Sequence, residues 1–177
     1  MAHEQVRRQS EKALLVLAPR HPRRADAVAA LCEERGWTVA RRSKSETPAQ
    51  VDVWLIDTLG ELANFMALAE VVFMGGSLVP IGGHNLLEPV AIGAPIVTGP
   101  HNENAADIFD ALQAGDGLQQ INSARELGKA ISDALRQPEL TQQQVRNDAE
   151  VLSGGQGALA KACRALDEIL QTVEHSA

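Results

Sequence analysis

Residues 75–89, GGSLVPIGGHNLLEP, combine backbone freedom with polar side chains that could bind a ligand. Two glycine pairs let the backbone turn and let a ligand approach it closely, which a purely structural loop would not need. Asn85 and Glu88 have the spacing of an N-cap and its partner three residues into a short helix. The same groups suit a nucleotide, because a helix N-terminus binds phosphate and a carboxylate accepts ribose hydroxyls. We expect a ligand here, although spacing alone leaves both residues balanced between capping and binding.

The stretch PRHPRR, residues 19–24, is a second candidate. Arg20 lies between two prolines that restrict the loop, and its guanidinium can hold phosphate or carboxylate through paired hydrogen bonds. Arg23 and Arg24 are better explained as solvated residues of a helix start, although their charge opposes the helix dipole. No G-x-G-x-x-G motif follows the preceding apolar run, so a dinucleotide site of that type is not indicated.

The stretch DTLGELANF, residues 57–65, is the third candidate. Gly60 permits a tight turn, after which Glu61 and Leu62 enter the first turn of a helix. Free N–H groups at that point could bind an anion or the edge of a base. The spacing alone favours a structural alternative, in which Thr58 is the N-cap and Glu61 completes a capping box.

Apolar runs and helical patterns alternate along the chain, and these elements must position the three stretches. Strands are predicted at residues 13–19, 37–42, 51–57, 70–75, 94–99 and 117–121. Helices are predicted at residues 21–36, 60–69, 86–93, 102–115, 122–137, 139–152 and 157–173. This alternation predicts an α/β fold, a Rossmann-like doubly wound parallel sheet of about six strands. Ligands of such sheets bind at the carboxyl ends of strands, and the three stretches follow the first, third and fourth strands.

Composition and charge narrow the classes of function. With 45% hydrophobic but only 3% aromatic residues, the core must consist of Ala, Leu, Val and Ile. The formal net charge of −7 argues against nucleic acid as a partner, because such proteins need a basic face. No apolar run reaches the roughly 18 residues of a membrane span, and the N-terminus is polar, so a soluble protein is expected.

Neither a metal nor a cofactor is expected. The histidines form no H-x-x-x-H pair, the cysteines form no C-x-x-C pair, and no D-x-D motif occurs. Cys32 and Cys163 lie in separate predicted helices, which is typical of a reduced, cytoplasmic protein.

Three motifs together resemble one family. Residues 73–104, FMGGSLVPIGGHNLLEPVAIGAPIVTGPHNEN, are similar to the signature of the 3-deoxy-D-manno-octulosonic acid (Kdo) transferases of lipopolysaccharide assembly. APRHP and DTLGEL match that family in the same order and spacing, so the resemblance covers most of the chain. It implies a GT-B glycosyltransferase, in which two Rossmann-like domains flank a cleft. Residues 1–177 resemble only the second, donor-binding domain, and residues 157–173 would be the helix that crosses to the missing N-terminal domain.

The resemblance also implies site residues. Carried over by position, the contacts with CMP or CMP-Kdo are Pro19, Arg20, Gly60, Glu61, Leu62, Asn85, Leu86, Leu87 and Glu88. Further candidates in the same loops are His21, Gly76, Ser77 and His84. The family's general base is a glutamate of the first domain, so no catalytic base is assigned to this chain. Relatives often have Pro at position 86 and Glu at position 23, where this chain has Leu86 and Arg23.

The implied reaction transfers Kdo from CMP-Kdo to a lipid A precursor at the cytoplasmic face of the bacterial inner membrane. Helix N-termini and Arg20 would stabilise the leaving phosphate. The isolated domain is expected to bind the donor weakly and to be inactive alone. Two alternatives are the nucleotide-binding domain of another GT-B enzyme, a UDP-sugar transferase or epimerase, and an interaction domain that binds no nucleotide.

Overall fold

The apolar runs predicted as strands form six parallel strands within residues 2–154, which the computed structural model describes. They are β1 (Leu15–Leu17), β2 (Val39–Arg41), β3 (Val53–Leu55), β4 (Val72–Met74), β5 (Ile96–Thr98) and β6 (Leu118–Gln120). Each lies inside the range predicted for it. The α/β class, the parallel direction and the number of strands are therefore confirmed for the described residues.

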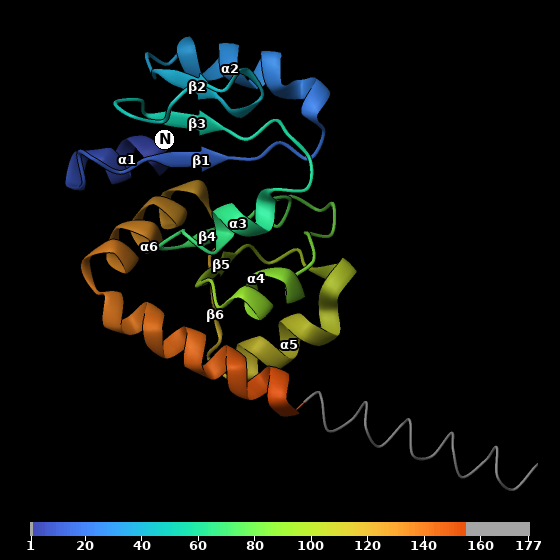
Figure 1. The fold of residues 1–177 in the computed structure, drawn as a ribbon. Helices are drawn as coiled ribbons and strands as arrows, with labels where there is room; N and C mark the ends of the chain where they lie inside the picture. The colour runs from blue at the N-terminus through green and yellow to red at the C-terminus, as the bar shows by residue number, and fades with distance from the viewer. Residues whose placement is uncertain (1, 155–177) are drawn as a thin grey trace, which may run out of the picture.

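The strands are divided between two sheets of three. The N-terminal sheet has the order β1-β3-β2, and the C-terminal sheet has the order β4-β5-β6. Val53 of β3 lies opposite both Leu15 and Val39, which makes β3 the central strand of its sheet. Ile96 of β5 lies opposite both Val72 of β4 and Leu118 of β6, so β5 is the central strand of the other sheet. Figure 1 shows the N-terminal sheet with α2 above the C-terminal sheet and its helices.

The helices also follow the prediction closely. They are α1 (Ala2–Gln9), α2 (Ala25–Glu33), α3 (Leu62–Met66), α4 (Leu87–Ile92), α5 (Ala106–Ala114) and α6 (Ala124–Arg136). Short 3-10 helices occupy Pro22–Arg24, Arg42–Lys44 and Glu103–Ala105. Residues 138–154 are helical as well, which confirms the helix predicted at 139–152. The helix predicted at 157–173 lies outside the described residues.

Helices cover both faces of the C-terminal sheet. Ile96 of β5 packs with Val90 of α4 and Leu112 of α5 in one buried cluster. The next residue, Val97, belongs to a second cluster with Ala130 of α6. Neighbouring residues of a strand point to opposite faces, and helices cover both, which explains why β5 is buried at every position, including the polar Thr98.

The N-terminal sheet has a smaller core. Leu55 of β3 packs against Ala25 and Ala29 of α2. The buried hydrophobic side chains of the described residues are all Ala, Val, Leu, Ile or Met, as the low aromatic content requires.

Helix α1 was not among the predicted elements, because it carries a single buried residue, Val6, among polar neighbours. This helix packs along α6, where a Cβ on Gly128 would lie only 2.5 Å from Gln5 Oε1. Its other side reaches the start of β3, since Arg7 pairs with the Asp52 carboxylate at 2.6 Å. Helix α1 therefore connects the N-terminal sheet to a helix of the C-terminal sheet.

One carboxyl group is buried in the helix at residues 138–154. Asp148 has no exposed surface, and its carboxylate oxygens have no hydrogen-bond partner among the described residues. Burial raises the pKa of Asp148 to about 7, because the charged form is poorly solvated there. The carboxyl packs directly against Gly117, where no Cβ would fit. The turn before β6 therefore requires glycine at this position.

Candidate functional site

The predicted site residues lie in three loops at the carboxyl ends of β1, β3 and β4, or in the first turn of the helix that follows the loop. Residues 18–21 follow β1, residues 56–61 follow β3 and residues 75–86 follow β4. The loops after β1 and β3 leave their sheet on the same side, on the right of Figure 1. Helix α3, which follows the loop after β3, packs against α4, which follows the loop after β4. This is the edge at which parallel sheets bind ligands.

Asp57 ties the loop after β2 to the loop after β3. Its carboxylate accepts hydrogen bonds from the Ser43 backbone N–H (2.8 Å), the Ser43 hydroxyl (2.7 Å) and Arg41 Nε (2.8 Å). Arg41 also pairs with Asp26 of α2. Burial alone would raise the pKa of Asp57, but the bonds from Ser43 and Arg41 outweigh it and lower the pKa to about 2. Asp57 is thus an ionised structural residue, with its side chain only 2% exposed.

Glu61 lies near the Asp57 carboxylate and its bonds to Ser43 and Arg41, a group that we call the Asp57 clamp. The Glu61 carboxylate has two partners. Arg42 donates from Nη2 to Oε1 (2.7 Å) and from Nε to Oε2 (3.2 Å), and the Thr58 hydroxyl donates to Oε2 (2.6 Å). The bond from Arg42, followed by that from Thr58, lowers the pKa of Glu61. The carboxylate is therefore ionised and held at both oxygens.

The capping box that spacing favoured does not form in this loop. Helix α3 begins at Leu62 with Glu61 as its N-cap residue and no side-chain cap bond. Thr58 is bonded to the Glu61 carboxylate instead. Gly60 has φ +83°, which confirms the predicted tight turn.

The second glycine pair makes room for the protein's own chain. Gly82 and Gly83 have φ +91° and +66°, where residues with a Cβ are strained. A Cβ on Gly83 would lie 2.8 Å from the His101 carbonyl oxygen, and one on Gly82 would overlap the Asn104 side chain. Around Gly75, by contrast, nothing lies within 4 Å of the Cβ position. The interpretation that glycines admit a ligand thus stays a prediction, and it applies best to Gly75.

Ser77 holds this loop to the end of β5. Its hydroxyl donates to the Met74 carbonyl (2.6 Å) and accepts from the Gly99 backbone N–H (2.7 Å). The residue has no exposed surface, so its side chain presents nothing to a ligand. Gly76 has φ +78°, and His84 is half-buried with no hydrogen bond or ion pair among the described residues.

The four residues around the start of α4 differ in what they can offer a ligand. Asn85 Oδ1 accepts a hydrogen bond from the backbone N–H of Leu87, the first residue of α4 (3.0 Å), but the N-cap residue of this helix is Leu86, and the expected capping box of Asn85 and Glu88 does not form. Leu86 is fully buried in the core, so only its backbone could meet a ligand. Leu87 and Glu88 are exposed, and Glu88 has no hydrogen bond or ion pair among the described residues.

The loop after β1 presents an unpaired cation. Arg20 is exposed and makes no hydrogen bond or ion pair within residues 2–154. Pro19 is half-buried and His21 is exposed. Pro22 begins the 3-10 helix that leads into α2, as its fixed φ favours.

Arg42, which lies beside Glu61, was not among the predicted site residues. A signal was present, because Arg41 and Arg42 end a predicted strand and so lie at the same edge as the site loops. The roles of Asn102 and Asn104 were also missed. Asn102 is 3% exposed and bonds Thr98 (2.9 Å) and the Gly99 carbonyl (2.7 Å), which shapes the turn against the glycine pair.

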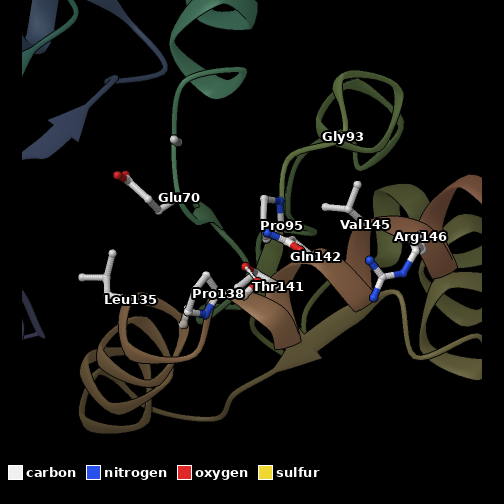
Figure 2. A pocket seen from close by; sticks show the side chains of 11 residues that line it. Glu70, Gly93, Pro95, Leu135, Pro138, Thr141, Gln142, Val145 and Arg146 are labelled. Carbon is white, nitrogen blue, oxygen red and sulfur yellow. Dashed lines mark hydrogen bonds between the residues drawn. The ribbon is translucent and has the colours of Figure 1, made fainter.

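A pocket of about 390 Å³ lies elsewhere, at the amino ends of β4 and β5. Figure 2 shows its lining, which comes from the residues before these strands, the end of α6 and the helix at 138–154. Glu70 and Arg146 are its only charged residues. None of the predicted site residues lines this pocket, and the carboxyl ends of parallel strands are the usual place for a ligand. The three loops therefore stay the predicted ligand site.

The described residues show neither a metal site nor a membrane span. Within residues 2–154, no three His, Cys, Asp or Glu side chains are grouped so that they could hold a metal ion. No helix in the same range has the length and apolar character that crossing a bilayer requires.

Comparisons with known proteins converge on one family, although no protein-family model matches the chain. It is 37% identical over 160 residues to the 3-deoxy-D-manno-octulosonic acid transferase of Haemophilus influenzae, covering 89% of this chain and 38% of that protein. It is 41% identical over 121 residues to the enzyme of the same name from Bordetella pertussis, covering 67% and 28%. The chain thus spans less than two fifths of the length of these curated relatives.

A solved structure matches over most of its length. The C-terminal CMP-Kdo binding domain of WaaA from Acinetobacter baumannii superposes with a TM-score of 0.81 and 34% identity. The match covers 85% of this chain and 79% of that one.

Proposed function

The chain belongs to the 3-deoxy-D-manno-octulosonic acid (Kdo) transferase family, and on this premise we propose that it is a donor-binding domain that binds the CMP moiety of CMP-Kdo. One observation carries the proposal. Two unpaired, exposed charges of opposite sign, Arg20 and Glu88, follow the carboxyl ends of β1 and β4, where the motif loops lie.

Each loop has a chemical role in this proposal. Arg20 binds the phosphate, since a guanidinium offers paired donors to its oxygens. Glu88 accepts the ribose hydroxyls, and Asn85 with the start of α4 adds donors near the phosphate. The turn at Gly60, Glu61 and Leu62 meets the edge of the base. Leu86 contributes through its backbone, and Pro19 and Leu87 complete the contact surface.

We further propose that this domain acts within a two-domain GT-B glycosyltransferase. In that enzyme the acceptor hydroxyl of a lipid A precursor attacks the anomeric carbon of Kdo, and CMP leaves. The general base belongs to the N-terminal domain, and this chain stabilises the negative charge that develops on the leaving phosphate. The full-length enzyme acts at the cytoplasmic face of the inner membrane. The chain alone transfers no Kdo.

Calorimetric titration with CMP tests the donor assignment. We expect weak but saturable binding of CMP, weaker binding of UDP, and a loss of about tenfold in affinity for Glu88→Ala, since a hydrogen bond to a charged group contributes on the order of 1.5 kcal/mol. Glu33→Ala is the matched control, because Glu33 is an exposed carboxylate at the far end of α2.

Two results would redirect the assignment. Tighter binding of UDP than of CMP would favour the alternative, a UDP-sugar transferase or epimerase. Absence of binding by the folded chain, with the Arg20→Ala, Glu88→Ala double variant behaving identically, would favour an interaction domain without a nucleotide.

A further inference from the structure

We propose that Arg42 is a positioning residue of the donor site, which holds the Glu61 carboxylate in one orientation and leaves one acceptor position for a hydrogen-bond donor of the nucleotide. The proposal deepens the proposed function and rests on it. Neither the motifs nor the family resemblance assigns a role to Arg42.

Arg42 is itself fixed by the fold. It follows β2 directly, and the last residue of β2, Arg41, lies opposite Leu55 at the end of β3. The next residue, Ser43, is bonded to the buried Asp57 carboxylate through both its backbone N–H and its hydroxyl. The backbone of Arg42 is therefore clamped on both sides against the loop that carries Glu61.

The contact between Arg42 and Glu61 determines the direction of the carboxylate. Two donors of one planar guanidinium meet its two oxygens, at 2.7 Å and 3.2 Å, which is the paired geometry of strong charge-assisted bonds. The Thr58 hydroxyl occupies a second position on Oε2 at 2.6 Å. A carboxylate has about four acceptor positions, so these three bonds leave one, on Oε1.

The remaining position is accessible and selective. The side chains of Glu61 and Arg42 are 31% and 39% exposed, so a ligand can reach the pair. An ionised carboxylate only accepts hydrogen bonds, so the group that meets Glu61 must be an O–H or N–H donor. In CMP these donors are the ribose hydroxyls and the amino group of cytosine, whereas uracil carries a carbonyl oxygen in place of that amino group.

Binding of CMP to the full 177-residue chain tests the proposal. We expect Arg42→Gln to weaken CMP binding about tenfold and Arg42→Lys to recover part of that loss, because an ammonium keeps the charge but not the paired geometry. Glu61→Gln and the double variant should each lose about as much as Arg42→Gln, because one interaction is removed in all three. The control is Arg35→Gln, which removes an exposed guanidinium at the opposite end of α2.

Titration of the Glu61 carboxyl carbon by NMR gives a second readout that needs no ligand. We expect the pKa of Glu61 to rise toward its ordinary value in Arg42→Gln and to stay low in Arg35→Gln. The pKa of Asp57 should stay low in both variants, which shows that the neighbouring clamp is intact.

The outcomes separate this proposal from the proposed function. Absence of CMP binding by the wild-type chain defeats both. Normal CMP binding by wild type and by Arg42→Gln, or an unchanged pKa of Glu61 in Arg42→Gln, overturns the role of Arg42 alone. If Arg42→Gln weakens CMP but not UMP, the donor is the cytosine amino group. If it weakens both but not 2′-deoxy-CMP, the donor is the 2′-hydroxyl.

Discussion

Two carboxylates four residues apart, Asp57 and Glu61, have different tasks at the same edge of the fold. Asp57 is buried and bonded to Ser43 and Arg41, so it holds two loops together. Glu61 is held by Arg42 and Thr58 but stays partly exposed. The difference arises from burial, since a fully enclosed carboxylate has no position left for a ligand.

Replacing Asp57 by Asn should destabilise the fold in a pH-dependent way. The pKa of Asp57 is about 2 in the folded chain and ordinarily 3.8, so its stabilisation is present above pH 3.8 and lost as the pH falls through 2. The shift corresponds to about 2 kcal/mol. We expect urea unfolding to show a loss of about 2 kcal/mol for Asp57→Asn near neutral pH, and a shrinking difference in acid. Asp110→Asn, on the exposed face of α5, is the control and should be as stable as wild type. If Asp57→Asn is also as stable as wild type, the Asp57 carboxylate does not stabilise the fold.

At the scale of elements, the loop between β4 and α4 is packed against the turn that follows β5. The Asn104 backbone N–H donates to the Gly82 carbonyl (3.1 Å), and the His101 backbone N–H donates to the Ser77 carbonyl (2.9 Å). Backbone hydrogen bonds thus join residues 77–82 to residues 101–104, two parts of the same motif. The glycines of the second pair serve this contact, and the exposed start of α4 is positioned by it.

Alanine substitutions in the two glycine pairs should therefore have different effects. We expect Gly83→Ala to lower the free energy of unfolding by about 1–3 kcal/mol, because its φ is +66° and its Cβ would lie against the His101 carbonyl. Gly75→Ala should stay within about 0.5 kcal/mol of wild type, since its Cβ would meet nothing. Thermal unfolding of both variants measures the contrast, and similar losses at the two positions would contradict this account.

At the scale of the whole molecule, helix α1 connects the two sheets at the end opposite the site. A hydrogen bond between His3 Nε2 and the Asp52 carbonyl oxygen and the ion pair of Arg7 hold α1 to Asp52 at the start of β3, and its other face lies on α6. The described strands of the two sheets share no backbone ladder, so side-chain packing of this kind sets their relation.

Val6→Ala should test that connection. Val6 is 3% exposed, and loss of its two methyl groups should cost about 1–2 kcal/mol, partly offset by the better helix propensity of Ala. Urea unfolding monitored by circular dichroism measures this loss. Gln9→Ala, an exposed change in the same helix, should leave the free energy of unfolding unchanged. If Val6→Ala also leaves it unchanged, α1 contributes little to holding the two sheets together.

The sequence by itself determined the alternation of strands and helices, the composition of the core and the three loops that carry the motifs. Apolar runs, turn residues and capping groups act over a few neighbouring positions, so they can be recognised locally. Only the tertiary structure decided that the strands form two sheets, that Gly82 and Gly83 make room for residues 101–104, and that Arg42 holds Glu61. Helix α1 also needed the tertiary structure, because its one buried face forms against α6, more than a hundred residues away. These contacts join groups distant in sequence, and their partners are set by packing rather than by local pattern.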